Sequence, residues 1–214
     1  MDFALLIHLT AVVGFALLLV KQTTVLVNSS KRFFFLGLMS FEVISVMQVL
    51  YKFFLSKELA LYAALIEFCF MVLAMLFLFF SVTHLFKEHL GKLEKASAVI
   101  GIVIIAWVLI VKPIIIHSVN GANQAFLTKE TALVALSYAF LVGVITIRNL
   151  FKIKERLRGE LREKIKKFTI GLGLLVIIGV VLGGVSQLLH TRSFTVIALL
   201  AFAVYVYPLF GGRG

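Results

Sequence analysis

The chain has 214 residues, of which 62% are hydrophobic and 14% charged, and its formal net charge is +11. Soluble domains are about 45–50% apolar and about 25% charged, so this composition indicates a protein whose solvent is a lipid bilayer. The positive charges lie in short segments beside apolar runs, where anionic lipid headgroups attract them. This placement argues against nucleic-acid binding. The single cysteine, Cys69, excludes an intramolecular disulfide and a thiolate metal cluster.

Seven apolar runs come close to the roughly 20 residues that a membrane-spanning helix needs. They predict an all-α polytopic protein, one domain with a bundle of seven transmembrane helices. The first run is preceded by an acidic residue where a secretory signal would be basic, so we interpret it as a retained helix. The predicted spans are 3–27, 33–54, 59–83, 96–117, 131–147, 168–189 and 193–210.

The fourth span and the segment that follows it contain residues that interrupt helices. Pro113 is predicted to kink the fourth helix at Lys112, because proline removes a backbone hydrogen bond. The segment 118–130 carries Asn, Gly and Gln, which favour turns, and is predicted to be a loop.

The segment 148–167 is strongly basic, with nine Lys and Arg against three Glu. Lys and Arg in short loops are retained on the cytoplasmic side of a membrane. Alternate predicted loops carry fifteen basic residues on the side of this segment and four on the other. The pattern predicts a multi-pass cell-membrane protein with its N-terminus outside and its C-terminus inside. The basic residues expected to contact lipid or a partner are Lys152, Lys154, Arg156, Arg158, Arg162, Lys164, Lys166 and Lys167.

An amphipathic stripe runs through the same basic segment. Its members recur every three or four residues, as on one face of a helix. The fifth and sixth helices are therefore predicted to continue beyond the membrane, with a break near Gly159. The stripe can lie on anionic lipid, pack against the chain itself or meet a cytosolic protein partner, and we favour the first two. The stripe consists of Leu150, Ile153, Leu157, Leu161 and Ile165.

A shift of 134 residues aligns the second and third spans with the sixth and seventh. Phe34 then falls on Phe168 and Leu38 on Leu172. An internal repeat of this kind predicts a parallel arrangement of three helices, one linker helix and three helices.

In its predicted topology the chain resembles seven-helix carriers of the SWEET or PQ-loop type, KDEL-receptor-like proteins and opsins. It also resembles the seven-helix sensor region that precedes some prokaryotic histidine kinases, where a basic loop joins helices five and six. These resemblances imply transport or sensing. The proline-glutamine pair of the PQ-loop carriers is absent, and the seventh span, FTVIALLAFAVYVYPLF, lacks the lysine that binds retinal in opsins. The resemblance therefore assigns no role to any residue.

Ionisable residues inside a membrane cost about 2.5–3.5 kcal/mol each on insertion scales, so each is a candidate for function. Glu42 lies near the middle of the second span, flanked by Ser40 and Ser45, whose hydroxyls can help to satisfy its carboxyl. It is either a protonated acid hydrogen-bonded between helices or a residue that couples protons or binds a ligand.

A further group of polar residues falls in the outer half of the predicted bundle. The functional interpretation is a polar site open to the outside, in which Lys112 pairs with Glu67 and His8 or His190 accepts a proton. The alternative is that the basic residues extend towards the headgroups and Glu67 is protonated or bonded to a neighbouring helix. The group consists of His8, Gln48, Glu67, Lys112, Gln187 and His190.

Cofactor and catalytic motifs are few. His8 with His117 or His190 would lie at a depth suitable for a bis-histidine haem, although lone interfacial histidines are commoner, and no other metal-ligand spacing is present. Asp2 is the only aspartate, and no phosphate-binding loop or serine-nucleophile motif occurs. The sequence therefore predicts neither a metal site nor an enzyme.

The prediction for function is a small membrane carrier or channel for a polar solute or ion. A seven-helix sensor that signals through the basic segment is the alternative, and a membrane electron carrier with b-type haem is the second alternative. The chain ends four residues after the last predicted span, without an effector domain, and this favours transport.

Overall fold

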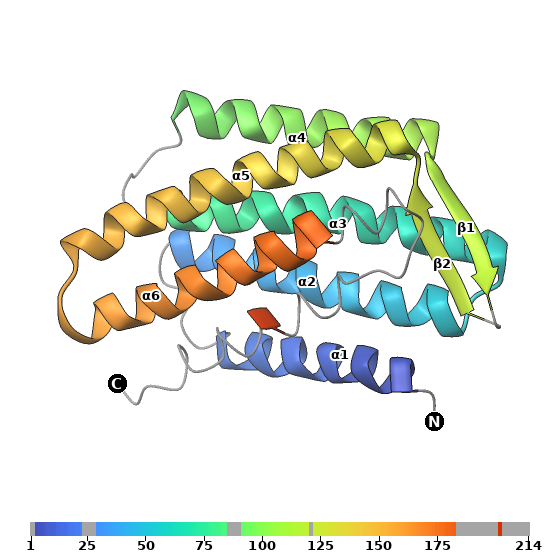
Figure 1. Ribbon diagram of the computed structural model, residues 1–214, viewed down its shortest axis with the longest axis horizontal. Helices are drawn as coiled ribbons and strands as arrows, with labels where there is room; N and C mark the ends of the chain where they lie inside the picture. The colour runs from blue at the N-terminus through green and yellow to red at the C-terminus, as the bar shows by residue number, and fades with distance from the viewer. Residues whose placement is uncertain (1–2, 23–28, 85–90, 120–121, 183–200, 203–214) are drawn as a thin grey trace.

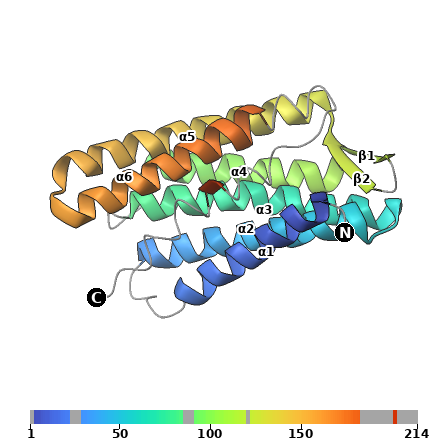
Figure 2. The same ribbon diagram turned by 60° about the horizontal axis from the view of Figure 1, so that its bottom comes forward.

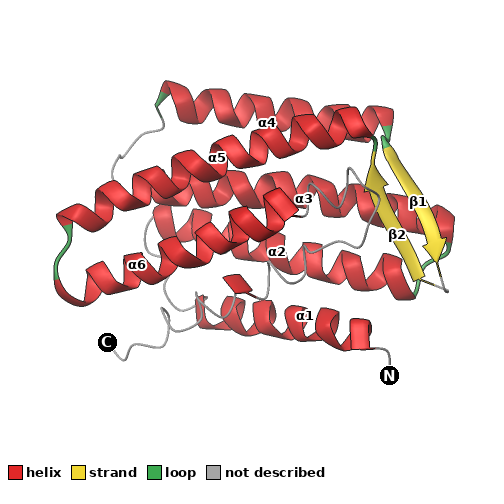
Figure 3. Ribbon diagram, in the orientation of Figure 1, coloured by secondary structure: helices red, strands yellow, loops and turns green. Residues whose placement is uncertain are grey.

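The computed structural model of the chain describes residues 3–22, 29–84, 91–119, 122–182 and 201–202. These residues form a bundle of nearly aligned helices with a two-stranded hairpin at one end (Figures 1 and 3). The elements are α1 (Phe3–Gln22), α2 (Ser29–Phe53), α3 (Lys57–Thr83), α4 (Lys92–Val111), β1 (Ile114–Val119), β2 (Ala122–Leu127), α5 (Lys129–Arg156), α6 (Gly159–Leu174) and the π-helix η2 (Leu175–Leu182).

Four of the described helices are long and apolar enough to cross a membrane: α2 from Lys31, α3, α4 and α5. This agrees with a multi-pass membrane protein built from helices. The predicted first span corresponds to α1, and the predicted sixth span to the end of α6 and to η2. Of the predicted seventh span, only the helical residues Ala201 and Phe202 lie within the described residues.

The helix α3 lies at the centre of the bundle, with α1 and α2 on one side and α4 and α5 on the other (Figures 1 and 2). It packs against α2, α4, α5 and the hairpin, and 72% of its most apolar 18-residue window is buried. The corresponding share is 28% for α4 and 33% for α5. A polar side chain in this buried part of α3 therefore has to find its partners within the protein.

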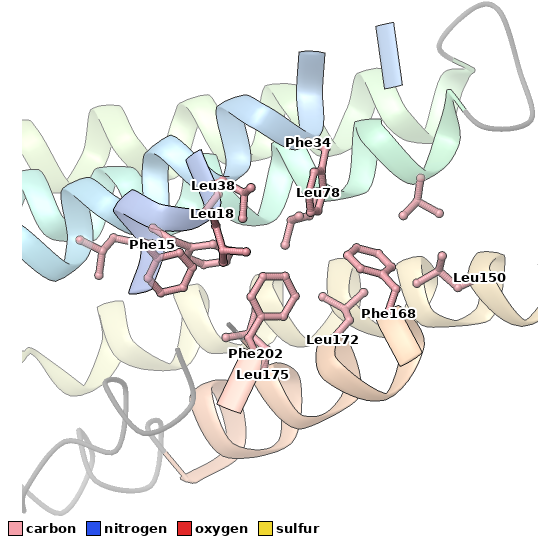
Figure 4. Close-up of a cluster of buried hydrophobic side chains, with 14 of the residues drawn as sticks. Phe15, Leu18, Phe34, Leu38, Leu78, Leu150, Phe168, Leu172, Leu175 and Phe202 are labelled. Atoms are coloured by element: carbon pink, nitrogen blue, oxygen red, sulfur yellow. The ribbon is translucent and has the colours of Figure 1, made fainter. Parts of the chain in front are cut away.

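The main core joins α1, α2 and α3 to the second half of the chain (Figure 4). Phe34 of α2 contacts Phe168 of α6 with their ring centroids 5.5 Å apart. Phe202 lies against both α2 and α6. Its ring centroid is 5.4 Å from that of Phe41 and 6.2 Å from that of Phe168. Leu38 and Leu172 are buried in the same cluster.

The prediction for the end of the fourth span was wrong. The helix was expected to reach His117 with a kink at Lys112, but α4 ends at Val111. Lys112 takes the left-handed conformation, with φ of 49°, because the ring of Pro113 excludes the preceding residue from the ordinary helical region. The β-branched residues that follow then form the strand β1. The fold is therefore mostly helical rather than all-α.

The segment predicted as a loop after the fourth span contains the strand β2, which pairs antiparallel with β1. The register sets Ile116 opposite Ala125 and His117 opposite Gln124. Ile116 is buried with Tyr51 of α2 and Ala60, Ala63 and Ala64 of α3. One face of the hairpin thus covers the end of the α2–α3 pair.

Close packing between α5 and η2 depends on a glycine. A Cβ atom at Gly143 would lie 2.6 Å from Cγ2 of Val176. We predict that Gly143→Ala destabilises the fold by about 1–3 kcal/mol, because one of the two segments has to move to accept the methyl group. Thermal and denaturant unfolding in detergent micelles measures the change.

Gly173→Ala on α6 is the matched control, because a Cβ atom there would meet nothing within 4 Å. The control variant should be as stable as the parent protein or slightly more stable. Equal stability of the two variants would contradict the packing described here.

Candidate functional site

A buried carboxyl group lies at the centre of the site. Glu67 is 7% exposed and projects from the central helix α3. The Nε2 atom of Gln48 on α2 donates a hydrogen bond to Glu67 Oε1 over 2.5 Å, and the Tyr51 hydroxyl donates to the same carboxyl group. Gln48 and Tyr51 are three residues apart on one helix and therefore face α3 together. We call His8, Gln48, Tyr51, Lys52 and Glu67 the Glu67 cluster.

A cation completes this cluster. The Nζ atom of Lys52 lies 2.9 Å from Nε2 of His8 on α1 and 6.0 Å from the centroid of the Tyr51 ring. It lies close enough to Glu67 for the charges of the two groups, when both are ionised, to attract each other. Because an ammonium group can only donate, a charged Lys52 requires a neutral His8 with its proton on Nδ1. Three helices thus bring a carboxyl group, an amino group and an imidazole ring together.

The hairpin fixes the end of α2 beside the cluster. Asn123 of β2 donates from Nδ2 to the carbonyl oxygens of Tyr51 (3.0 Å) and Leu55 (2.8 Å). Its Oδ1 accepts a hydrogen bond from Ser118 of β1 at 2.6 Å. The last carbonyl groups of a helix have no N–H group of the same helix as a donor. Asn123 supplies such a donor at the end of α2. This contact attaches the β-hairpin directly above Tyr51 and Lys52.

The structure brings together three of the predicted outer residues, His8, Gln48 and Glu67. It does not bring Lys112 to them, so the pair of Lys112 with Glu67 in the functional interpretation is not formed, whereas the bond of Glu67 to the neighbouring helix α2 agrees with the alternative interpretation. Lys112 is exposed at the end of α4, and its Nζ lies 5.1 Å from the centroid of the Tyr62 ring. The termination of α4 before Pro113 places Lys112 at the helix end rather than inside the span. Lys52, rather than Lys112, is the cation near Glu67.

The remaining predicted residues stand apart or fall outside the description. Gln187 and His190 lie outside the described residues. His117 is exposed on β1, with its ring 5.6 Å from that of Phe126. Within the described ranges, no group of three His, Cys, Asp or Glu side chains could hold a metal ion. The haem hypothesis based on His8 stays a prediction, and it would require Lys52 to leave the His8 Nε2 atom.

Glu42 is half-buried on α2 and is not part of the Glu67 cluster. Its Oε2 atom is buried and has no hydrogen-bond partner among the residues that the structure describes. The expected help from neighbouring hydroxyls is absent there, because Ser40 and Ser45 donate to the carbonyls of Leu36 and Phe41 on their own helix. Such bonds to the preceding turn are the usual choice of serine inside a helix.

Sequence reasoning missed Tyr51, Lys52 and Asn123. Lys52 lies within the predicted second span and is not among the candidate residues. The spacing of Gln48, Tyr51 and Lys52, at positions i, i+3 and i+4, is the signal that would have placed them on one helical face. Asn123 was part of a predicted loop, and no pattern pointed from it to α2.

The basic segment forms a helical hairpin at the opposite end of the bundle (Figure 1). The helix α5 continues to Arg156, and α6 begins at Gly159, whose φ of +62° favours glycine. Leu150 and Ile153 of the stripe are buried in the main core, and Leu157 and Ile165 pack against it. The described part of the stripe is therefore used within the chain, which leaves the basic face exposed.

Ion pairs on α6 order part of that face. Lys164 Nζ lies 2.7 Å from Glu160 Oε1, and Lys166 Nζ lies 3.6 Å from Glu163 Oε2. The hydrogen bond from Lys164 and its charge hold the pKa of the exposed Glu160 carboxyl below its ordinary value. The other cations of the hairpin, including Arg156, Arg158 and Arg162, point to its exposed surface.

Comparison with known proteins gives no relative from which a role could be transferred: no protein-family model matches the chain, and neither do the curated proteins and solved structures with which it was compared. The site therefore has to be judged by its own chemistry.

The contact between Asn123 of the β-hairpin and the carbonyls of Tyr51 and Leu55 leads to a testable prediction. Asn123→Ala removes one hydrogen bond to the last turn of α2 and one to the residues that follow it, and leaves the Tyr51 and Leu55 carbonyls without this donor. The loss should cost about 1–3 kcal/mol, the penalty for buried polar groups left unpaired. Thermal unfolding should show this loss, and hydrogen exchange should become faster in β1 and β2.

The neighbouring variant Gln124→Ala is the control, because Gln124 is only half-buried and does not bond to α2 in the described structure. If Asn123→Ala exchanges and unfolds as Gln124→Ala does, Asn123 does not hold the hairpin in place.

Proposed function

We propose that this protein is a small multi-pass membrane carrier or channel for a polar solute or ion, with the Glu67 cluster as its binding or coupling site. In this proposal seven helices cross the cell membrane, the N-terminus is outside and the C-terminus is inside. The two ends of the described bundle differ in charge as the orientation requires. The end with the α5–α6 turn carries the many basic residues of that helical hairpin. The opposite end, where the β-hairpin lies, carries the lysines Lys57, Lys112 and Lys129.

The exposed surface of the bundle supports a lipid environment. Ile110 on α4 is 80% exposed and Val103 is 61% exposed, and Leu141 of α5 is 57% exposed. Many large apolar side chains of α4 and α5 are exposed in this way, and lipid chains would cover them. At about 1.5 Å per residue, the 28 residues of α5 extend about 42 Å. This exceeds the hydrocarbon thickness of about 30 Å, so the basic end of α5 would reach beyond the lipid chains.

The Glu67 cluster is the observation that carries the proposal. A buried carboxyl and an ammonium group are expensive in a membrane, and such groups mark substrate or proton pathways. Packing alone gives no reason to place an acid on the most buried helix of the bundle. The cluster also lies at the interfaces of three helices, where small relative movements would change its contacts.

The predicted internal repeat gains support from the core. Residues close to a twofold axis meet their own counterparts across that axis. Phe34 and Phe168, which the repeat aligns, lie with ring centroids 5.5 Å apart, and their aligned neighbours Leu38 and Leu172 share the same cluster. A parallel repeat of this kind suits a carrier in which two halves move against each other.

The sensor remains the second candidate, supported by the exposed basic face of the α5–α6 hairpin. Because the described stripe residues pack against the main core, a movement of the bundle would be transmitted to this face. A cytosolic partner with an acidic surface could then detect the movement.

We predict that Glu67→Gln lowers flux by at least about tenfold, equivalent to about 1.4 kcal/mol, while the protein still folds. Glutamine keeps the shape of the side chain and removes its negative charge. The measurement is uptake or efflux of small polar solutes and protons in proteoliposomes. Glu42→Gln is measured beside it, because Glu42 is the other predicted coupling residue.

Glu58→Gln is the matched control, since Glu58 is exposed in the first turn of the same helix α3, and its flux should equal that of the parent. Unchanged flux in both Glu67→Gln and Glu42→Gln would contradict the carrier proposal.

The basic face should bind anionic lipid headgroups. In nanodiscs, the thermal stability of the protein should rise with the fraction of anionic lipid, because a cation near such a surface gains about 1 kcal/mol. Replacing Arg156, Arg158 and Arg162 by glutamine should weaken this dependence, and salt should weaken it further.

The control replaces Lys57 and Lys129 by glutamine, since these exposed lysines lie at the opposite end. The lipid assignment fails if the arginine variant responds to anionic lipid as the parent does. Loss of a co-purifying cytosolic protein in that variant would favour the sensor instead.

A further inference from the structure

The surroundings of Lys52 are those of a bound ammonium group. The imidazole Nε2 of His8 lies 2.9 Å from Nζ, the Tyr51 ring lies 6.0 Å away by its centroid, and the Glu67 carboxylate supplies the opposite charge. A lone pair, an aromatic face and a carboxylate are the groups that proteins use to bind ammonium ions. These three groups come from three different helices.

We propose that the Glu67 cluster is a binding site for the ammonium group of a small primary amine or for the ammonium ion, and that Lys52 occupies this site in the structure. The inference rests on the proposed carrier function and names the class of its solute. Lys52 then acts as a tethered cation that exchanges with the solute.

A vacant acceptor supports a solute that donates hydrogen bonds. Gln48 is 1% exposed, and its Oε1 atom has no partner among the described residues, although its Nε2 is bonded to Glu67. A buried amide oxygen without a partner is costly. A solute with several N–H groups can bond to this oxygen and to Glu67 at the same time.

The donor set favours an ammonium group over a metal ion. Hard cations such as Mg²⁺ and Ca²⁺ need several oxygen ligands at short distance. The cluster offers one carboxylate, an amide oxygen, an imidazole and an aromatic face. This mixture of weak acceptors suits a group that donates hydrogen bonds and also interacts with an aromatic ring.

Exchange of Lys52 with a solute keeps the charge of the cluster constant. A solute cation that replaces the Lys52 ammonium leaves one positive charge beside Glu67, so no uncompensated charge is buried. Lys52 lies in the last turn of α2 and is half-buried. Its long side chain can therefore withdraw past the end of the helix to the polar interface.

The test removes the tethered cation and supplies a free one. In Lys52→Ala the thermal stability should fall, and added methylammonium or ethylammonium should restore a large part of the loss. Binding of radiolabelled methylammonium to the purified protein should be at least about tenfold tighter in this variant than in the parent, because the competing lysine is gone. Sodium at the same concentration controls for ionic strength.

Two further variants define the site. Lys57→Ala, which removes an exposed lysine five residues later, should neither lose stability nor respond to methylammonium. Adding Glu67→Gln to Lys52→Ala should weaken methylammonium binding by at least about tenfold, because the carboxylate charge is lost. If Lys52→Ala does not fold, Lys52→Met keeps the packing volume, and its methylammonium binding is measured instead.

The results separate this inference from the carrier proposal. Saturable methylammonium binding that depends on Glu67 and is stronger without Lys52 would support it. Binding that is absent, or that is equal with and without Glu67, would overturn it. In that case a Glu67-dependent flux of another solute would still support the carrier proposal. Amine binding without any flux would instead support the ammonium site and contradict the carrier proposal.

Discussion

A carboxyl group on the most buried helix has to be satisfied by the helices around it, and this constraint organises one end of the bundle. Glu67 obtains a hydrogen bond from Gln48 and a positive charge from Lys52, both on α2. Lys52 in turn requires the neutral imidazole of His8 on α1. The three N-terminal helices are therefore joined by polar contacts at this end and by aromatic packing elsewhere. A relative movement of the helices would change the distances of Lys52 and His8 from Glu67 and the access of solute to Glu67.

The β-hairpin and the basic hairpin complete the two ends of the bundle in different ways. At one end Asn123 bonds to the carbonyls of Tyr51 in α2 and of Leu55 just after it, and Ile116 packs over α3, so that the β-hairpin covers part of the end that holds the Glu67 cluster. At the other end α5 and α6 present cations, while the described residues of their apolar stripe pack inward. In a membrane, these features would give a polar site near one face and a positively charged element at the other.

Hydropathy predicted the four described helices that can cross a membrane, because a spanning helix needs length and apolar composition, both of which are local properties. It failed after Val111, where Pro113 and the isoleucines that follow favour a strand. Asn120 and Gly121 lie between β1 and β2, and Asn-Gly is the pair that short hairpins prefer, so this signal was present. The partner of Glu67 was not predictable, because the choice between Lys52 and Lys112 depends on where α4 ends and on how α2 faces α3.

The central claim is that solute reaches the Glu67 cluster from one side of the membrane. The most direct test places a cysteine at Lys52, a half-buried member of the Glu67 cluster in the last turn of α2, in a protein in which Cys69 is replaced by alanine. A membrane-impermeant thiol reagent should modify it from the side of the β-hairpin, and methylammonium should slow the modification. Modification from neither side would show that the cluster is sealed, and the account of a working site would be wrong.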